Sequence, residues 1–476
     1  MKDRKEATRR RWLEVLAEHR LDWDRAGAEH YWSPRLDTAP RAELRRIQNT
    51  KLAAAVPFLY ENSPFYRRRF ERLGMTPDDI RTVDDLPKWP VVDKREMIED
   101  ALANPPWGTY SAHDDALWAE RGWMIFGTSG TTGTPRVFRY SQFDREQWEW
   151  ANARALHSMG FRKGDCAMLI SGFGPHVWIW GVSVGLHRMG IPMIPGGGLD
   201  ARMRANFLAR YGATILACTP SYALYLGRTM QEMGLDPAKT AVKTIFLGGE
   251  PWMGIPATRR RLEELWGARS VEFYGCTEAS PHAGGYSCPH AVLPGGQVAT
   301  HLMEDIGVWE LVDAEKKAPV AVGQRGLTVT TNLNSESSPQ LRFLVGDYTV
   351  FDDAACACGR THVRAIGSFV GRADDIVTIR GIKLYPSQIE EGVRAVPGIG
   401  DEYEIVLATE ADGLDTMTIR VEHPAPPADA AKVAEQVAGE VRTRCEVRVG
   451  VEVLRPGTLP KTEFKAKRVR DTRKKA

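Results

Sequence analysis

Hydrophobic positions change their spacing from one region of the chain to the next. Residues 9–20 and 41–60 carry apolar side chains at helical spacing and predict two helices. A shorter helix is predicted at 63–73, where the triplet Arg67–Arg69 is interpreted as a solvent-exposed face. From about 165 to 280, short apolar runs alternate with helical stretches and end in glycine-rich turns, which predicts an α/β fold with mostly parallel, helix-covered sheets.

The pattern changes twice more toward the C-terminus. From about residue 305 the sequence predicts consecutive strands, and from Gly371 it predicts a compact mixture of strands and helices. We therefore expect a large N-terminal domain over 1–370, with a β-rich subdomain at about 305–370, and a small α+β C-terminal domain over 371–476.

Composition narrows the class of protein. The 476 residues are 43% hydrophobic and 26% charged, which is ordinary for a soluble globular protein. A net charge of +2 gives no reason to expect nucleic acid or membrane as a partner, and the sequence lacks the run of roughly 18 apolar residues that a membrane span needs. The first residues are charged and do not resemble a secretory signal, and the count of 7 cysteines is odd. Both features favour a reducing, cytoplasmic location.

The stretch Gly127–Tyr140 is rich in glycine and hydroxyl side chains and lies between two predicted strands. Glycines let successive backbone N–H groups converge on one point, and the hydroxyls and Arg136 add further donors and a positive charge. Such a turn suits a polyphosphate, although its order of residues is not that of the P-loop. A flexible polar linker is the alternative interpretation.

The sequence Thr128-Ser-Gly-Thr-Thr-Gly-Thr-Pro135 resembles the phosphate-binding signature of adenylate-forming enzymes. These enzymes include acyl- and aryl-CoA ligases, luciferases and adenylation domains. Four further stretches match this family in chain order, and the phenylacetate-CoA ligase branch matches best. The resemblance implies a catalytic role for Thr132 and ATP binding by Thr128, Ser129, Gly130, Thr131, Gly133 and Arg136. Arg136 stands where lysine is common in the family.

The stretch Tyr274-Gly-Cys-Thr-Glu278 resembles a second family motif. The resemblance implies that Tyr274 stacks near adenine, that Thr277 contacts a phosphate, and that Glu278 helps to hold Mg²⁺, which requires hard oxygen ligands. Asp347 stands where the family binds the ribose hydroxyls. The nucleotide-binding set also includes Gly249, Glu250, Pro251 and Gly275.

The C-terminal segments resemble the mobile domain of the family. Asp374 matches the hinge aspartate, Arg372 would contact ribose or phosphate, and Gly381 would let pantetheine pass, with Lys383 also assigned to cofactor binding. Lys465 matches the catalytic lysine that bridges the carboxylate and the α-phosphate. Because Phe464 replaces the usual glycine, Lys461 and Lys467 remain rival alignments.

An aromatic, glycine-rich segment follows the strand predicted at 165–170, at the edge where open α/β sheets place ligands. It could line a pocket for a flat aromatic acid, or it could be ordinary core. The substrate-pocket candidates are Phe173, His176, Trp178, Trp180, Gly275 and Cys276.

Cysteines and histidines form one further candidate constellation. Some phenylacetate-CoA ligase relatives hold a structural zinc with one cysteine, one histidine and a Cys-x-Cys, and the resemblance implies such a site here. The ligands would be Cys288, Cys356 and Cys358 with His301, and His290 is the rival histidine. A closed Cys₃His set is saturated and therefore structural.

Together these features predict an ATP-dependent acid–CoA ligase that activates an aromatic acid as an acyl-adenylate and uses ATP, Mg²⁺ and coenzyme A. An enzyme that loads a carrier-protein phosphopantetheine is the first alternative, and a non-catalytic nucleotide-binding module is the second. The identity of the acid and a homodimeric state are left open.

Overall fold

The computed structural model describes most of the chain and divides it into two compact units. The described residues are 2–18, 30–128, 136–250, 252–279, 284–294, 296–369, 371–372, 377–379, 382–410, 415–424, 427–462, 466 and 468–473. The first unit comprises residues 1–167, 172–194 and 271–368, and the second comprises 168–171, 195–270 and 369–476. In the described part of the chain, no helix has the length and apolar character needed to cross a membrane.

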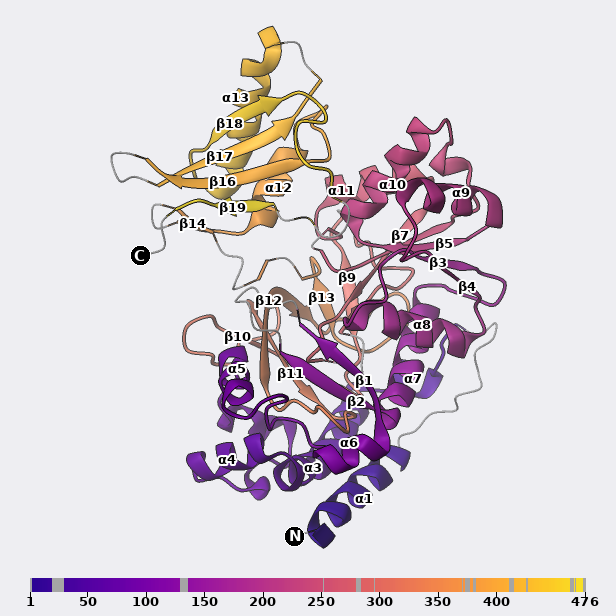
Figure 1. The fold of residues 1–476 in the computed structure, drawn as a ribbon. Coiled ribbons are helices and arrows are strands. Elements are labelled where there is room, and N and C mark those ends of the chain that lie inside the picture. Colours follow the sequence, from indigo (N-terminus) through magenta and orange to yellow (C-terminus); the bar gives the residue numbers. More distant parts are fainter. Residues whose placement is uncertain are drawn as a thin grey trace. The chain divides into compact units, whose positions relative to one another are not determined.

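The first unit begins with packed helices (Figure 1). Helices α1 (Lys2–Glu18) and α3 (Arg41–Asn62) confirm the two predicted N-terminal helices. They are joined by Trp12 and Phe58, whose rings stack with centroids 4.8 Å apart. The further helices at this end are α2 (Pro34–Asp37), α4 (Pro64–Leu73), α5 (Lys94–Ala103) and α6 (Asp115–Arg121).

The interpretation of Arg67–Arg69 as a solvated face is wrong for Arg69. Its side chain is only 6% exposed, pairs with Glu96, and lies 5.4 Å from the centroid of the Trp89 ring. Its guanidinium also donates to the carbonyl of Val91 at 2.9 Å. The helix was predicted correctly, but its partners come from a segment that follows it, which local spacing does not reveal.

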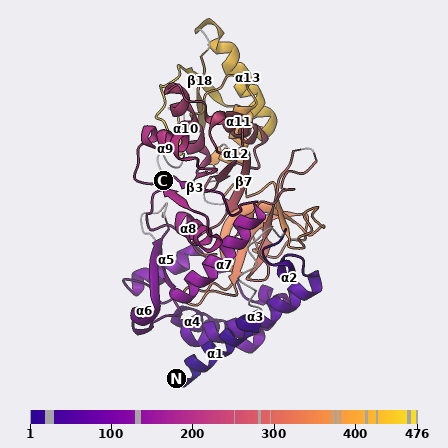
Figure 2. The same ribbon diagram turned by 90° about the vertical axis from the view of Figure 1, so that its right-hand side faces the viewer.

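Helices α7 (Gln142–Ser158) and α8 (Val177–Met189) lie side by side in the first unit (Figure 2). Ser141 caps α7 by accepting a hydrogen bond from the Asp144 amide. Gly185 of α8 faces Asn152 of α7, and a Cβ at Gly185 would lie 2.6 Å from the Asn152 Cβ. Only glycine therefore allows this close approach of the two helices.

A sheet of antiparallel strands carries most of the remaining first unit. The strand order is β10–β11–β12–β13–β9–β8–β7, and every pair in it is antiparallel. The bounds are β7 Arg269–Tyr274, β8 Gly285–Tyr286, β9 Ala299–Leu302, β10 Gly307–Val312, β11 Arg325–Asn332, β12 Phe343–Asp352 and β13 Arg364–Ile366. The β-rich character predicted after residue 305 is present in β10–β13.

In the second unit, strands β5 (Ile215–Cys218) and β6 (Thr244–Leu247) pair in parallel, as the alternation of strands and helices predicts. Strand β3 neighbours β5. The other elements of this region are α9 (Ala201–Tyr211), α10 (Pro220–Glu232) and α11 (Pro256–Trp266). Strands β3 (Ala167–Leu169) and β4 (Met193–Pro195) each have residues in both units.

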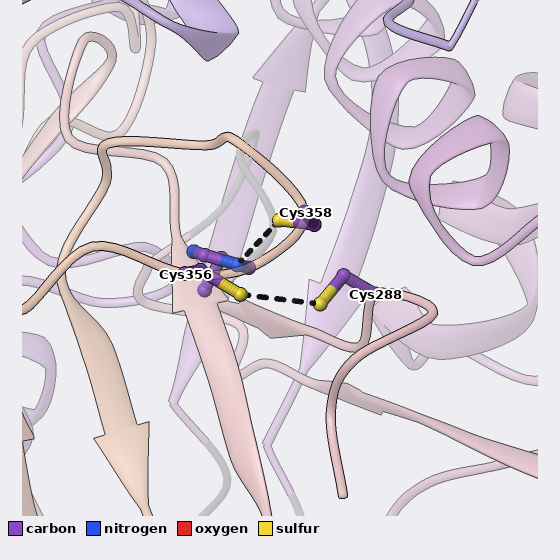
Figure 3. Close-up of side chains that lie close together, drawn as sticks. Cys288, Cys356 and Cys358 are labelled. Carbon is purple, nitrogen blue, oxygen red and sulfur yellow. Dashed lines mark hydrogen bonds between the residues drawn. The ribbon is translucent and has the colours of Figure 1, made fainter. Parts of the chain in front are cut away.

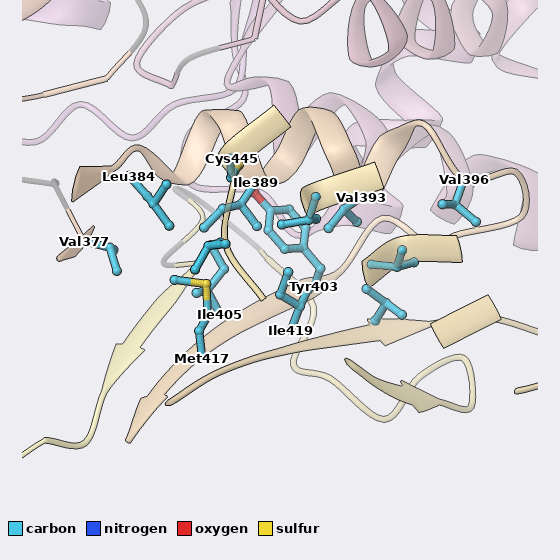
Figure 4. Packing of buried hydrophobic residues seen from close by; sticks show 14 of the residues in the cluster. Val377, Leu384, Ile389, Val393, Val396, Tyr403, Ile405, Met417, Ile419 and Cys445 are labelled. Carbon is cyan, nitrogen blue, oxygen red and sulfur yellow. The ribbon is translucent and has the colours of Figure 1, made fainter. Parts of the chain in front are cut away.

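The C-terminal part of the second unit is a four-stranded sheet with two helices packed against it. Its strand order is β18–β17–β16–β19, and Figure 4 shows buried side chains of α12, β16 and β17 meeting in one core. Its elements are β14 (Val377–Ile379), β15 (Ile382–Leu384), α12 (Pro386–Arg394), β16 (Tyr403–Thr409), β17 (Asp415–Glu422), α13 (Pro427–Cys445), β18 (Gly450–Leu454) and β19 (Val469–Asp471). The fold is thus a mixed α/β architecture with a smaller C-terminal sheet.

Candidate active site and metal centre

The glycine-rich stretch joins two paired strands. Strands β1 (Gly122–Gly127) and β2 (Val137–Ser141) are antiparallel, with Gly127 opposite Val137. The Thr128 amide donates to the Arg136 carbonyl at 3.0 Å, and the Arg136 amide donates to Thr128 Oγ1 at 3.3 Å. The two predicted flanking strands are therefore confirmed, and Thr128 and Arg136 lie side by side. Outside the described residues lie Ser129, Gly130, Thr131, Thr132 and Gly133.

The two nucleotide motifs of the first unit meet at an ion pair. Arg136 Nη2 lies 2.7 Å from Glu278 Oε1, and both side chains are nearly buried, at 11% and 7% exposure. The backbone at Thr277 and Glu278 is fixed as well. Tyr140 Oη donates to the Thr277 carbonyl at 2.5 Å, and Asn332 Nδ2 donates to the Glu278 carbonyl at 3.2 Å. A buried carboxylate in such a pair can exchange its guanidinium partner for a hard cation.

A second contact brings Tyr274 to Asp347. Tyr274 ends strand β7, and its hydroxyl donates to the Asp347 carboxylate on β12. Asp347 is held by a reciprocal pair of bonds with Thr328, whose Oγ1 accepts from the Asp347 amide at 3.2 Å and donates to its carbonyl at 3.0 Å. The Tyr274 and Trp309 rings lie 6.5 Å apart. An aromatic ring and a carboxylate thus lie together, the pair that the sequence assigns to adenine and ribose.

The aromatic segment forms the start of α8 and is not wholly core. Phe173 is 39% exposed, and its ring meets Trp180 edge-on at 4.9 Å. Trp180 Nε1 donates to the Gly174 carbonyl at 3.0 Å, which folds the segment back on itself. Trp178 approaches Phe273, the residue before Tyr274, at 6.1 Å between ring centroids.

His176 is half-buried at the N-terminal boundary of α8. Burial lowers the pKa of His176, so the imidazole is neutral at pH 7 and can offer both a donor and an acceptor. Gly275 is exposed and Cys276 is partly exposed, directly after β7. The candidate substrate residues of 173–180 are therefore connected to the nucleotide motif through Trp178 and Phe273.

In the second unit, the glycine-rich turn after β6 places Glu250 at the end of a parallel strand. Gly249 adopts φ +86°, a left-handed conformation that favours glycine. Glu250 Oε2 accepts from the Ser221 hydroxyl at 2.8 Å, and Oε1 accepts from the Ala466 amide at 2.8 Å. Burial raises the pKa of Glu250 and outweighs these hydrogen bonds, which lower it. Glu250 thus anchors the residue that follows Lys465 in the sequence.

Several predicted residues of the second unit lie outside the described residues, and these are Pro251, Asp374, Gly381 and Lys465. Lys383 is in strand β15, and Arg372 is half-buried. Gly371 adopts φ +90°, and a Cβ there would lie 2.4 Å from Tyr385 Cδ1. Glycine is therefore required where the C-terminal segment begins.

Four side chains separated in sequence converge in a buried cluster in the first unit (Figure 3). Cys288, His301, Cys356 and Cys358 place their ligand atoms within 4.8 Å of one another. Cys358 Sγ lies 3.3 Å from His301 Nε2, and Cys288 Sγ lies 3.8 Å from Cys356 Sγ. The rival His290 is exposed and is not part of this cluster of described residues.

The spacing of the cluster fits a metal better than a disulfide. A disulfide requires about 2.05 Å between sulfurs, whereas tetrahedral Zn²⁺ with bonds of about 2.3 Å sets them about 3.8 Å apart. His301 Nδ1 lies 3.2 Å from the His362 carbonyl, so this nitrogen donates and Nε2 keeps its lone pair toward the sulfurs. The donor set, its burial and the histidine orientation all fit a closed structural site.

Comparison with known proteins places this geometry in a class. A model of the AMP-binding enzymes matches residues 67–330, and a model of the AMP-binding enzyme C-terminal domain matches residues 381–473. The fold and the nucleotide motifs are those of adenylate-forming enzymes. The chain belongs to the family of AMP-binding enzymes.

Several of its relatives are CoA ligases. The phenylacetate-coenzyme A ligase of Thermus thermophilus is 31% identical over 93% of this chain and 100% of its own length. The phenylacetate-coenzyme A ligase of Aromatoleum evansii is 30% identical over 92% of this chain and 97% of its own. The crystal structure of 2-hydroxyisobutyryl-CoA ligase in the postadenylation state, in complex with 2-HIB-AMP, is 30% identical, covers 95% of each chain and superposes with a TM-score of 0.87.

Sequence reasoning did not find several residues that hold the site together. Tyr140, Asn332 and Thr328 fix the backbone or side chains of the nucleotide motifs, and Ser221 binds Glu250. Tyr140 could have been suspected because it follows the phosphate turn on the same strand. The others carry no local signal, since each acts across a fold-dependent contact.

Proposed function

We propose that this chain is an ATP-dependent acid–CoA ligase that activates an aryl or arylacetic acid as an acyl-adenylate and transfers the acyl group to coenzyme A, releasing pyrophosphate and then AMP. The observation that carries the proposal is the buried meeting of Arg136 with Glu278, which joins a phosphate-binding turn to a carboxylate suited to Mg²⁺. Membership of the AMP-binding enzymes supports the same reaction class.

In the first step a carboxylate oxygen of the acid attacks the α-phosphorus of ATP, and pyrophosphate leaves. The chief barrier is the approach of two anions, which positive groups must offset as charge develops. Arg136 and Lys465 supply these charges, and Glu278 would hold Mg²⁺ as a hard oxygen ligand. Bound Mg²⁺ would neutralise phosphate charge.

In the second step the thiolate of coenzyme A attacks the acyl carbon and displaces AMP. We propose that residues 371–476 form a small lid domain that turns about Asp374 between the two steps. Arg372, Gly381 and Lys383 would then meet the nucleotide or the pantetheine arm. No covalent bond to the protein is required in either step.

The aromatic character of the acid is supported by the side chains beside the nucleotide motif. Trp178 contacts Phe273, one residue before Tyr274, and Phe173 and Trp180 pack against each other nearby in sequence. Such flat apolar surfaces favour an aromatic ring over a small branched acid. Relatives differ on this point, since some are named for phenylacetate and one for 2-hydroxyisobutyrate.

A pyrophosphate-release screen over aryl, arylacetic, heteroaryl and short aliphatic acids, with ATP, Mg²⁺ and CoA, tests the proposal. We expect the highest kcat/KM with an aromatic acid and a requirement for CoA in multiple turnovers. Release that is highest with a branched aliphatic acid would overturn the aromatic assignment. Product formed only with a phosphopantetheinyl carrier protein, and not with free CoA, would favour the alternative acceptor.

His176→Ala should change which acids are accepted more than it changes ATP use. The neutral imidazole can bind a polar ring substituent, and one lost hydrogen bond costs about 0.5–1.5 kcal/mol, or roughly 2- to 12-fold in kcat/KM. The measurement is the ratio of kcat/KM for a hydroxylated and an unsubstituted acid. An unchanged ratio would remove His176 from the substrate site.

We also propose that Cys288, His301, Cys356 and Cys358 hold a structural Zn²⁺, because their spacing and burial fit a closed tetrahedral site. A bound zinc would supply no chemistry to the reaction. It would cross-link the segment after β8, strand β9, and the turn between β12 and β13, and β12 also carries Asp347. Metal analysis of the purified protein is expected to give one zinc per chain.

A further inference from the structure

A group of buried charged side chains lies next to the cysteine–histidine cluster in the first unit. Arg154 is fully buried and donates to Asp37 Oδ1 at 2.7 Å and to Asp305 Oδ1 at 2.8 Å. Lys51, also buried, donates to the Asp305 carbonyl at 2.7 Å. Arg360 pairs more distantly with Asp37, at 4.0 Å. These five side chains form one connected set.

The set does not balance its own charge. It holds three cations and two carboxylates, and burial lowers the pKa of Lys51 only to about 8, so that lysine is mostly protonated at pH 7. His362 Nε2 lies 3.0 Å from Arg154 Nη2, and the Glu304 amide donates to His362 Nδ1 at 3.1 Å, so Nδ1 carries no proton and the imidazole is neutral. At the edge of this set, Arg41 and Glu304 form an ion pair, so their charges cancel. One positive charge is left among the described residues, and a buried net charge is costly unless an anion lies close to it.

Arg360 is the member of the set that faces the cysteines. It is 2% exposed, and its three guanidinium nitrogens have no oxygen acceptor within the described part of the chain, whereas the Cys358 sulfur is a hydrogen-bonding partner of the side chain. It lies two residues after Cys358, whose sulfur interacts with it electrostatically. A divalent metal held by three thiolates and a neutral histidine carries one net negative charge. This single negative charge equals the one positive charge that is left over in the buried set.

We propose that Arg360 is a positioning residue for the metal centre: its buried positive charge offsets the single net negative charge of a divalent ion bound by Cys288, His301, Cys356 and Cys358. This inference rests on the metal assignment proposed above. Because Arg360 also pairs with Asp37, the metal centre and the segment 30–39 become one electrostatic unit.

The N-terminal segment is bound directly to the Cys-x-Cys turn. His30 Nε2 lies 3.0 Å from the Cys358 carbonyl, and Tyr31 Oη donates to the same carbonyl at 2.9 Å. Arg360 lies over the Tyr31 ring at 5.1 Å. Gly359 adopts φ +80°, and a Cβ there would lie 2.1 Å from Tyr31 Oη, so only glycine permits this contact. Loss of the metal should therefore loosen residues 30–39 before the rest of the unit.

The test is zinc transfer from full-length, zinc-loaded protein to the chelator 4-(2-pyridylazo)resorcinol. Partners that orient metal ligands typically change metal affinity by about 10- to 100-fold, and we expect Arg360→Met to weaken zinc binding by that factor. Arg360→Lys keeps the charge and should recover part of the loss. The matched control is Arg342→Met, which removes another buried arginine that pairs with Glu310 and not with the cysteines.

Two further measurements separate positioning from general stability. Cobalt-reloaded wild-type protein should show thiolate-to-cobalt absorption, and Arg360→Met should shift it whereas Arg342→Met should not. Zinc removal should speed amide exchange in residues 30–39 of the wild type. The positioning role would be overturned if both Arg360→Met and Arg360→Lys matched the wild type in zinc transfer and in cobalt spectra. That outcome would leave the metal assignment intact. A wild-type protein that binds neither metal would overturn both.

Discussion

Replacing Lys465 with alanine should reduce acyl-adenylate formation by at least about 100-fold and leave ATP binding nearly unchanged. The reason is electrostatic, because a donor aimed at developing charge contributes mainly in the transition state, and removing one typically costs about 10²–10³ in kcat. A lysine suits this role because it is a mobile point charge on a long stem. The measurement is acid-dependent exchange of pyrophosphate into ATP, with ATP affinity determined separately by calorimetry.

Two neighbouring lysines provide matched controls for Lys465. Lys461 is 54% exposed, lies 3.5 Å from Glu232 and sits over the Tyr225 ring, so Lys461→Ala should keep near-normal exchange. Lys467→Ala tests the other possible alignment of the tail. Normal exchange in Lys465→Ala, together with loss of exchange in either control, would assign the catalytic charge to that other lysine.

Glu278→Gln should lower adenylation by about 10²-fold and raise the Mg²⁺ concentration needed for half-maximal rate. The substitution removes the charge of a hard metal ligand while keeping the shape of the side chain. It also leaves Arg136 without its carboxylate, since the two atoms lie 2.7 Å apart in a nearly buried pair. The measurement is a Mg²⁺ titration of pyrophosphate release at saturating ATP and acid.

Loss of folding must be separated from loss of the metal ligand in this experiment. Breaking one partner of a buried ion pair typically costs about 3–5 kcal/mol, whereas replacing both partners is often neutral. The double variant Arg136→Met, Glu278→Gln should therefore regain thermal stability without regaining activity. Full activity in a stable Glu278→Gln protein, with an unchanged Mg²⁺ requirement, would exclude Glu278 as the metal ligand.

The parts of the site that were predictable are those encoded by local residue order. Strands β1 and β2 followed from the apolar runs on either side of a glycine- and hydroxyl-rich stretch, and the pairing of Gly127 with Val137 confirms them. The helices α1 and α3 followed from apolar spacing alone. The cysteine cluster followed from a family resemblance, and its geometry came only with the fold.

The parts that were not predictable depend on long-range contacts. Arg154 reaches Asp37 and Asp305, which are 117 and 151 residues away, and nothing in the order of residues marks these three as partners. His301 and His290 could not be separated by spacing, because only the register of β8 and β9 places His301 beside the sulfurs. Arg69 shows the same point, since its burial depends on Trp89 and Glu96.

The central claim is that the acid's carboxylate attacks the α-phosphorus of ATP on this protein. The most direct measurement uses an aromatic acid whose carboxylate carries ¹⁸O, incubated with the protein, ATP, Mg²⁺ and CoA, followed by mass analysis of the products. The account predicts one ¹⁸O atom in AMP and none in pyrophosphate. Label found in inorganic phosphate or pyrophosphate, or thioester formed while AMP stays unlabelled, would contradict it.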